Sequence, residues 1–469
     1  MPQFETEELR ETKAMASAKR YRCSVVRDGS RSFLPFLAFL FGLFWIASLI
    51  LAREQLNTLV RGEHQRGTSS KAIALMEFVR EHGLSRWNDV RDEWRAFQQE
   101  LRRDFRSVLD DSQQPRSRQQ RDLRVLVVTS VGNDAESVTR FGETMAKLSV
   151  GQEEEEDGDH YRDVLDFAFF HYDGSNALWE HEAWYRESPR VVLKHVGKGC
   201  KVQFWQTLLD FRYLNVPSAY DYVWFIDEDL DFTFFDWEIF RTLLVAANPV
   251  AMQPAILPVA AGERAADYSD LKLQFDEVGG EVALAHTAPV VEVMATILST
   301  KVWPALNNRM ASHNGSSAWG MDGWWSKLGR LAKKNCPNAK VGNLVVDASP
   351  LVHVNTHKID RMNDHWSMID QRKVGIIHHQ QKGKKVSRSA SLSCPRMCLS
   401  TSNALGNNCN PYTKEDARLA FKVLERMYGT CSRFTVGDLE GRMIRGTFSN
   451  NFIPPSQPQK LTLSSLNDA

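Results

Sequence analysis

The sequence predicts an α/β fold in which a mostly parallel sheet is flanked by helices. Apolar runs rich in β-branched or aromatic residues at 124–130, 164–170 and 221–226 are the expected strands, and a helical segment follows the first at 135–147. Gly, Asn or Asp come shortly after each run, as expected where strands end. Strands that alternate with helices form sheets whose strands run parallel and whose two faces are covered.

Further segments continue this alternation along the chain. Strands are also predicted at 191–196 and within 290–300 and 342–354, and helices at 201–214, 321–333 and 414–428. Gly197-Lys198-Gly199 follows a strand, but Val202 occupies the third glycine position of a dinucleotide fingerprint. The sequence therefore argues against a dinucleotide site.

Composition bounds the class of protein. At 469 residues the chain can form one large domain with appendages or two ordinary domains. Hydrophobic residues at 43% and charged residues at 25% are typical of folded globular proteins. Lys+Arg and Asp+Glu balance at 58 each, so no overall positive charge indicates nucleic acid as a partner.

Residues 33–52 carry no charged side chain and predict a transmembrane signal anchor. As a helix this segment is about 30 Å long, which matches the hydrocarbon core of a bilayer. Leu51-Ala52-Arg53-Glu54 is a poor cleavage site, which argues against a removable signal peptide. Lys and Arg are denser before the segment than after it, so we expect the N-terminus in the cytosol and the rest in the lumen.

The cysteines agree with a lumenal location. Cys23 falls in the expected cytosolic tail, and six others follow the anchor: Cys200, Cys336, Cys394, Cys398, Cys409 and Cys431. An even set in an oxidising compartment predicts disulfides, whose connectivity the sequence leaves open. Zinc is the alternative, although only Cys394 and Cys398 approach ligand spacing. The sequon at Asn314 also fits a lumenal domain.

These features divide the chain into six regions. They are a cytosolic tail at 1–32, the anchor at 33–52, a helical stem at 53–121, an α/β catalytic domain at 122–360, a Cys-stapled extension at 361–446 and a disordered tail at 447–469. The stem contains helix-prone segments with little apolar material, so we expect it to hold the domain off the membrane. It also offers a surface for self-association.

Asp227-Glu228-Asp229 is the sharpest chemical feature of the sequence. It follows a strongly apolar strand, and ligands of open α/β sheets bind at the carboxyl ends of strands. Asp227 and Asp229 are two residues apart and can share one Mn²⁺ or Mg²⁺, because hard cations prefer oxygen ligands. The alternative is an ordinary acidic loop.

Two other residues are candidates for the same site. Asp322 lies in Gly320-Met321-Asp322-Gly323 at an expected helix start, where catalysis and helix capping are competing explanations. His353 lies in an apolar strand, where metal ligation competes with a role as an ordinary core histidine.

Taken together, the motifs resemble the domain-of-unknown-function 707 family, often labelled lysine-ketoglutarate reductase trans-splicing related. The resemblance covers roughly 124–357 and runs through Phe170–Gly174, Lys198–Phe204, Tyr220–Tyr222, Asp227–Leu230, Gln253–Ala255, Val291–Met294, Ala318–Asp322, Val346-Asp347 and Val352-His353. Ile226 stands where the family has Trp, and Val202 where it has an aromatic residue. Neither is a proposed ligand.

The order of these motifs also resembles that of GT-A glycosyltransferases, so the implied fold is GT-A-like (Rossmann-like). The resemblance implies that Asp227, Asp229 and His353 hold the metal and that Asp322 is the base for the acceptor hydroxyl. It further implies a place for Asp173 near the nucleoside, and for Lys198 or Lys201 near the phosphates; these are the cofactor-binding candidates.

The predicted function is metal-dependent transfer of a sugar from a nucleotide-sugar donor to a lumenal hydroxyl on a glycan, protein or lipid. A type II anchor with a stem favours the Golgi membrane, with the endoplasmic reticulum as the alternative location. Two other functions stay open. One alternative is a non-catalytic lumenal scaffold that keeps the fold. The other is a metal-dependent hydrolase, for which Asp231 and Asp236 are the only further carboxylates nearby.

Overall fold

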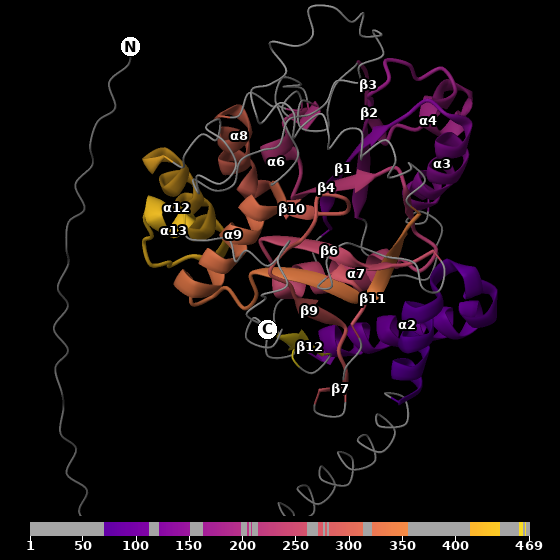
Figure 1. Ribbon diagram of the computed structural model, residues 1–469, viewed down its shortest axis with the longest axis horizontal. Helices are drawn as coiled ribbons and strands as arrows, with labels where there is room; N and C mark the ends of the chain where they lie inside the picture. The colour runs from indigo at the N-terminus through magenta and orange to yellow at the C-terminus, as the bar shows by residue number, and fades with distance from the viewer. Residues whose placement is uncertain are drawn as a thin grey trace, which may run out of the picture. The chain divides into compact units, whose positions relative to one another are not determined.

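The computed structural model describes residues 70–111, 122–150, 163–197, 204–205, 208, 214–259, 271–274, 277–278, 281–312, 321–354, 413–440, 459–462 and 465 (Figure 1). The chain divides into two compact units, Met1–Glu63 and His64–Ala469, and every described residue belongs to the second. Within the described residues, no helix is long and apolar enough to cross a membrane. The predicted anchor at 33–52 and the sequon at Asn314 lie outside them.

A mixed sheet forms the centre of the described unit. Its strands are β1 (Arg124–Val131), β2 (Val164–His171), β3 (Val191–Val196), β4 (Tyr222–Asp227), β5 (Leu230–Asp231), β6 (Ala251–Leu257), β9 (Ala285–Thr287), β10 (Ile297–Ser299), β11 (Asn343–His353) and β12 (Lys460–Leu461). The order is β12-β9-β11-β6-β10-β4-β1-β2-β3, with β5 paired to β11. A separate ladder joins β7 (Glu277–Val278) and β8 (Glu281–Val282).

Seven strands of the sheet run in one direction. They are β3, β2, β1, β4, β6, β11 and β12, while β10, β9 and β5 run against them. The predicted α/β class with a central sheet and flanking helices is therefore confirmed. The sheet is mixed, because four of its strand pairs are parallel and five are antiparallel. The antiparallel β10 lies between β4 and β6, where it joins the two parallel groups.

Helices and short 3-10 turns surround the sheet. They are η1 (Gly83–Arg86), α2 (Trp87–Asp111), α3 (Ala135–Val150), η3 (Trp179–His181), α4 (Ala183–Glu187), α6 (Val216–Ala219), α7 (Trp237–Ala247), η6 (Thr300–Val302), α8 (Trp303–Ser312), α9 (Met321–Asn335), α12 (Lys414–Tyr428) and α13 (Val436–Glu440). Residues 70–82 are also helical. The helices predicted at 135–147, 321–333 and 414–428 are confirmed as α3, α9 and α12.

Side chains of β1 alternate between two hydrophobic cores, because neighbouring residues of a strand point to opposite faces. Val125 and Val127 belong to the core that α2, α3 and α7 share. Leu126 and Val128 belong to the core that α8, α9 and α12 share. Both faces of the sheet are therefore covered by helices. Figure 1 shows α2 and α12, which belong to different cores, far apart from each other.

Helix α2 is part of the domain. Trp94 is fully buried, and its Nε1 donates to the Phe234 carbonyl at 3.1 Å. Gln98 Nε2 donates to the same carbonyl at 2.9 Å. The sequence predicts a helical stem over 53–121, but between residues 90 and 105 helix α2 contributes an apolar face to the domain core.

Strands β6 and β11 pair in parallel even though each contains a proline, Pro254 and Pro350. Proline has no N–H for the ladder and is unusual in a central strand. The register shifts between Val346 and Leu351, so β11 bulges opposite β6. Two N–H groups of the bulge donate instead to the carbonyl of Leu284, at 2.9 and 3.1 Å.

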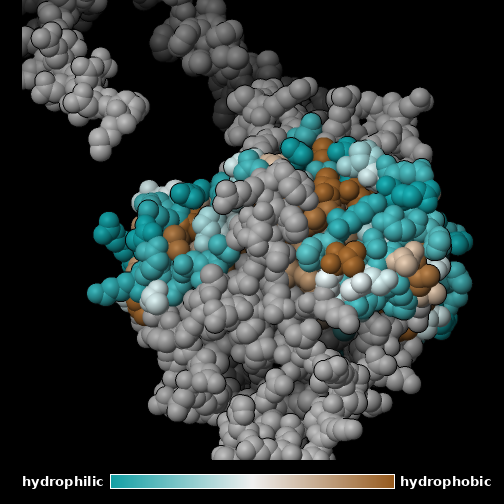
Figure 2. All heavy atoms as spheres, turned by 90° about the horizontal axis from the view of Figure 1, so that it is seen from above, coloured by the Kyte–Doolittle hydropathy of each residue, from teal (hydrophilic) through white to brown (hydrophobic). Residues whose placement is uncertain are grey.

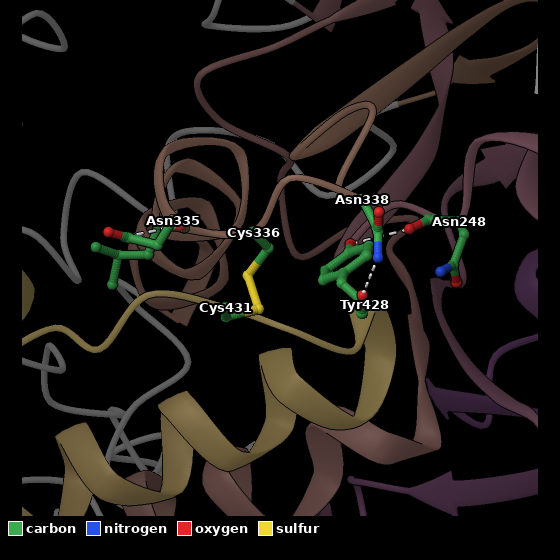
Figure 3. Close-up of a disulfide and its surroundings, with 7 residues drawn as sticks. Asn248, Asn335, Cys336, Asn338, Tyr428 and Cys431 are labelled. Carbon is green, nitrogen blue, oxygen red and sulfur yellow. Dashed lines mark hydrogen bonds between the residues drawn. A yellow bond between two sulfur atoms is a disulfide. The ribbon is translucent and has the colours of Figure 1, made fainter. Parts of the chain in front are cut away.

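A disulfide joins Cys336, after α9, to Cys431, after α12 (Figure 3). Asn338 Nδ2 donates to the Tyr428 carbonyl at 2.9 Å beside it. The part of the predicted Cys-stapled extension that contains α12 is thus fastened to the sheet domain. Cys200, Cys394, Cys398 and Cys409 lie outside the described residues.

The chain end also contributes to the sheet. Lys460 and Leu461 form β12 and pair with His286 and Ala285 of β9. The sequence predicts disorder for 447–469, and residues 459–462 are instead an ordered edge strand. Because this segment is polar and short, its order depends on pairing with β9, which its own composition does not reveal.

One face of the unit is mainly hydrophilic, with small hydrophobic patches (Figure 2). Among the described residues, the exposed large hydrophobic side chains are Leu178, Val196 and Val278. Single exposed apolar residues are normal on folded domains and indicate no interface by themselves.

Replacing Trp94 tests whether α2 belongs to the folding unit. We expect Trp94→Ala in the full-length protein to lower the free energy of unfolding by about 3–5 kcal/mol, because it leaves a cavity and removes a buried hydrogen bond. Urea unfolding measures the effect. Arg95→Ala on the exposed side of the same helix is the matched control and should change stability by no more than about 0.5 kcal/mol. Equal stability of the two variants would show that α2 packs elsewhere.

Candidate functional site

Three parallel strands end side by side at one edge of the sheet. Val131 of β1 lies opposite His171 of β2, and Ser130 of β1 lies opposite Asp227 of β4. The loops that follow β1, β2 and β4 are therefore neighbours. Such an edge is where ligands bind in open α/β sheets.

Asp229 and His353 meet at this edge. His353 Nε2 lies 3.0 Å from Asp229 Oδ2, although 124 residues separate them in sequence. The backbone fixes the contact, because β5 pairs with the end of β11 and the Val354 N–H donates to the Asp229 carbonyl at 2.8 Å. Two of the three predicted metal ligands are thus brought together.

The pKa of His353 reflects the charge around it. Burial alone lowers the pKa, but the hydrogen bond and charge of Asp229, together with the charges of Asp227 and Glu292, raise it above its ordinary value. The positively charged imidazole is therefore favoured here. Negative charge is concentrated at this edge of the sheet.

Glu228, between the two predicted ligands, serves another purpose that the sequence did not reveal. It is 6% exposed, and its Oε2 accepts a hydrogen bond from the Gly132 N–H at 2.6 Å. Its Oε1 accepts from the Tyr172 hydroxyl at 2.5 Å. Burial and the carboxylate of Glu228 raise the pKa of Tyr172, so the phenol stays protonated and donates. Glu228 thus connects the loops after β1, β2 and β4.

The loop after β1 is held closely against the loop after β2. A Cβ at Gly132 would lie 2.8 Å from the Tyr172 hydroxyl oxygen, so this approach requires glycine. Asp173 Oδ2 accepts from the Asn133 N–H at 2.7 Å, and its Oδ1 accepts from the Ser175 N–H at 3.1 Å. Asp173, predicted to lie near the nucleoside, is exposed at the same edge and braces both loops.

A segment before β10 forms the other wall of the site. The Asp227 N–H donates to the Met294 carbonyl at 2.8 Å. The Glu292 N–H donates to Oε1 of the buried Gln253 at 2.6 Å. Sequence reasoning did not assign Glu292 or Gln253 to the site, although both fall in the motifs that carry the family resemblance.

The structure describes the remaining predicted site residues to different extents. Asp322 lies in the first turn of α9, in agreement with the predicted helix start; its side chain is outside the described part. Trp325 Nε1 donates to the Val291 carbonyl at 2.7 Å, which brings this helix start beside the Glu292 segment. Lys198 and Lys201 lie outside the described residues.

The donor atoms suit a divalent cation. Carboxylate oxygens and an imidazole nitrogen are acceptable ligands of Mn²⁺, and carboxylates of Mg²⁺. The 3.0 Å between His353 Nε2 and Asp229 Oδ2 matches neighbouring ligands of an octahedral ion with bonds of about 2.1 Å. As the side chains stand, no group of three His, Cys, Asp or Glu within the described ranges is arranged to hold a metal ion. For Asp227, Asp229 and His353 to share one cation, at least one of their side chains must therefore rotate.

Comparisons with known proteins add the following. A family model described as "Protein of unknown function (DUF707)" matches residues 120–391. No curated protein matches the chain. Among solved structures, TarS of S. aureus is 12% identical over 53% of this chain, with a TM-score of 0.33, and the match spans 39% of TarS. The mannosyltransferase PcManGT from Pyrobaculum calidifontis, solved with GDP-Man and Mn²⁺, is 12% identical over 66% of this chain and 76% of its own, also with a TM-score of 0.33.

His171, the last residue of β2, gives the site edge a pH dependence. It is fully buried, its Nε2 lies 2.8 Å from the Tyr185 hydroxyl, and burial lowers its pKa to about 4. The unfolded chain, with an ordinary pKa of about 6.5, binds this proton first as the pH falls. Folding stability is therefore lost as the pH drops from about 6.5 towards 4.

We expect protonation of His171 to lower the free energy of unfolding by about 3 kcal/mol as the pH falls from about 6.5 to about 4. The variant His171→Gln keeps a polar partner for Tyr185 but cannot take up the proton. Urea unfolding at several pH values should give a steeper decline for the wild type than for the variant. Parallel curves would show that His171 is not a buried neutral imidazole.

Proposed function

Because this chain belongs to the DUF707 family, proteins of unknown function, we propose its activity from the geometry of its own site: metal-dependent transfer of a sugar from a nucleotide-sugar donor to an acceptor hydroxyl. The observation that carries the proposal is the contact between Asp229 and His353 beside Asp227, at the carboxyl edge of parallel strands. The GT-A-like order of the motifs gives this contact its chemical interpretation.

In this proposal Asp227, Asp229 and His353 hold Mn²⁺ or Mg²⁺. His353 would bind as the neutral imidazole, so the proton that the free site favours would leave when the cation binds. When bound, such a cation offsets the negative charge that develops on the leaving nucleotide diphosphate. The protein residues bind and orient the reactants around it. Lys198 or Lys201 contacts the phosphates, and Asp173 lies near the nucleoside while it braces the loops after β1 and β2.

Asp322 is the proposed base that accepts the proton of the acceptor hydroxyl. Its helix start is fixed to the site wall by Trp325 and Val291, which supports this role by position. The acceptor is a hydroxyl of a glycan, protein or lipid.

The geometry favours a transferase over a hydrolase. A metal-dependent hydrolase commonly uses further carboxylates beside the first pair. The two nearby candidates serve the backbone: Asp231 Oδ1 accepts from the Thr233 N–H at 2.8 Å, and Asp236 Oδ1 caps α7 through the Ile239 N–H at 3.0 Å. The concentrated negative charge around His353 argues against a purely structural scaffold, since a scaffold gains nothing from it.

We also propose that the domain lies in an oxidising lumen, anchored by residues 33–52 in the Golgi membrane. The disulfide between Cys336 and Cys431 supports an oxidising compartment, because such bonds are rare where thiols are kept reduced. The charge pattern around the apolar segment supports the orientation.

Peptide mapping without reduction tests this location. In protein isolated from its own cells with thiols alkylated at lysis, we expect the peptides of Cys336 and Cys431 to be recovered linked. Cys336→Ser should lower the free energy of unfolding by about 2–5 kcal/mol. Recovery of both cysteines as free alkylated thiols would contradict a lumenal domain.

Thermal shift with Mn²⁺ and a panel of nucleotide sugars tests the activity class. We expect one donor, at about 100 times its Kd, to stabilise the full-length protein by about 2.7 kcal/mol in the presence of Mn²⁺. The double variant Asp227→Asn/Asp229→Asn should lose this shift. Asp231→Asn, two residues beyond the pair, is the matched control and should keep it. Absence of any shift with every donor in the folded wild type would reject the transferase.

A further inference from the structure

Glu228 differs from its two neighbours in what surrounds it. Asp227 and Asp229 are half-buried, whereas Glu228 is 6% exposed and faces the loops after β1 and β2. A buried carboxylate is strongly destabilising unless donors replace its water. Here each carboxylate oxygen has a donor within 2.6 Å, one N–H and one O–H.

These two bonds join segments that are far apart in sequence. Gly132 is 96 residues from Glu228, and Tyr172 is 56 residues from it. Hydrogen bonds to a charged acceptor are roughly twice as strong as neutral ones and more directional. The Glu228 side chain therefore fixes the loops after β1 and β2 to the turn after β4.

The same turn is fixed from the other side through its backbone. The Asp227 N–H donates to the Met294 carbonyl at 2.8 Å, and the Asp229 carbonyl accepts from the Val354 N–H at 2.8 Å. Residues before and after Glu228 are thus held by the Glu292 segment and by β11. With Glu228 fixed as well, the turn has little freedom, and the directions of the Asp227 and Asp229 side chains follow from it.

We propose that Glu228 is a positioning residue, which orients Asp227 and Asp229 through its bonds to Gly132 and Tyr172 and does not itself bind the cation. The part of this proposal that concerns the cation rests on the proposed function. The Glu228 carboxylate is directed at Gly132 and Tyr172, and turning it towards a cation would weaken these two bonds and draw it away from the Gly132 N–H. Partners that orient metal ligands typically change metal affinity 10- to 100-fold when they are lost.

The chemistry of the two donors distinguishes the variants. In Glu228→Gln the amide oxygen can still accept from Gly132, and the amide nitrogen can donate to Tyr172, whose hydroxyl can also accept. In Glu228→Ala both bonds are lost. Tyr172→Phe removes one bond and leaves the carboxylate in place.

The test measures binding of Mn²⁺ alone by isothermal calorimetry, with thermal unfolding and hydrogen exchange of the peptides that contain Gly132 and the turn at 227–229. We expect Glu228→Gln to keep Mn²⁺ affinity within about threefold and Tyr172→Phe to weaken it about tenfold. Glu228→Ala should weaken it further and speed exchange in both peptides. Asp229→Asn should abolish binding and leave exchange at Gly132 unchanged.

Two outcomes of the Mn²⁺ titrations would overturn the proposal. If Glu228→Gln abolishes Mn²⁺ binding as completely as Asp229→Asn, then Glu228 is a ligand. If Glu228→Ala and Tyr172→Phe lower only the melting temperature and the folded protein binds Mn²⁺ as before, then Glu228 supports the fold without orienting the site. If the wild type binds no Mn²⁺, the proposed function fails separately, and hydrogen exchange then decides. Unchanged exchange at 227–229 in Glu228→Ala would overturn the positioning role, and faster exchange would support it.

Discussion

A carboxylate can be buried in a protein only where hydrogen-bond donors replace its water. The buried carboxylate of Glu228 therefore requires two donors at this edge of the sheet. Its two donors come from the ends of β1 and β2, so those strands must finish level with β4. The register does bring them level, with Val131 opposite His171 and Ser130 opposite Asp227. Sheet register and the buried charge therefore support each other, and Gly132 is needed because a side chain there would displace Tyr172.

The antiparallel β10 gives the edge its second wall. A purely parallel sheet would place a helix-covered crossover beyond β4, whereas β10 and the residues before it run back along β4. The Met294 carbonyl accepts a hydrogen bond from the Asp227 N–H, and the Val291 carbonyl accepts one from the indole N–H of Trp325. The start of α9 is therefore tied, through the Trp325 side chain, to the segment that also bonds to Asp227.

Much of the fold could be predicted from the sequence, because β1, β2 and β4 are largely apolar runs whose ends are marked by turn residues. Strand β6 could not be predicted, since Pro254 argues against a central strand, yet it pairs in register with Val346 just before the bulge in β11. Helix α2 was assigned to a stem because charged residues dominate it. Its few aromatic residues nevertheless lie on one face, and Trp94 among them is fully buried in the core.

The candidate site was predictable in its ligands but not in its connections. A strand end carrying Asp227 and Asp229 is visible in the sequence, and the motif order adds His353. The contact between Asp229 and His353 depends on the pairing of β5 with β11 over 124 residues, which no local pattern encodes. The separate role of Glu228 was equally hidden, because three consecutive carboxylates look alike until their burial is known.

The distribution of charge also bears on function. The pKa of His353 is raised by Asp229, Asp227 and Glu292, which reach it from two segments of the chain. Like charges gathered in a partly buried place destabilise a fold, so a protein without a use for them would gain stability by losing them. Proteins break such local rules mainly at functional sites. A protonated imidazole offsets part of this charge in the free site. In the proposed site a divalent cation would take over that role, with His353 as a neutral ligand.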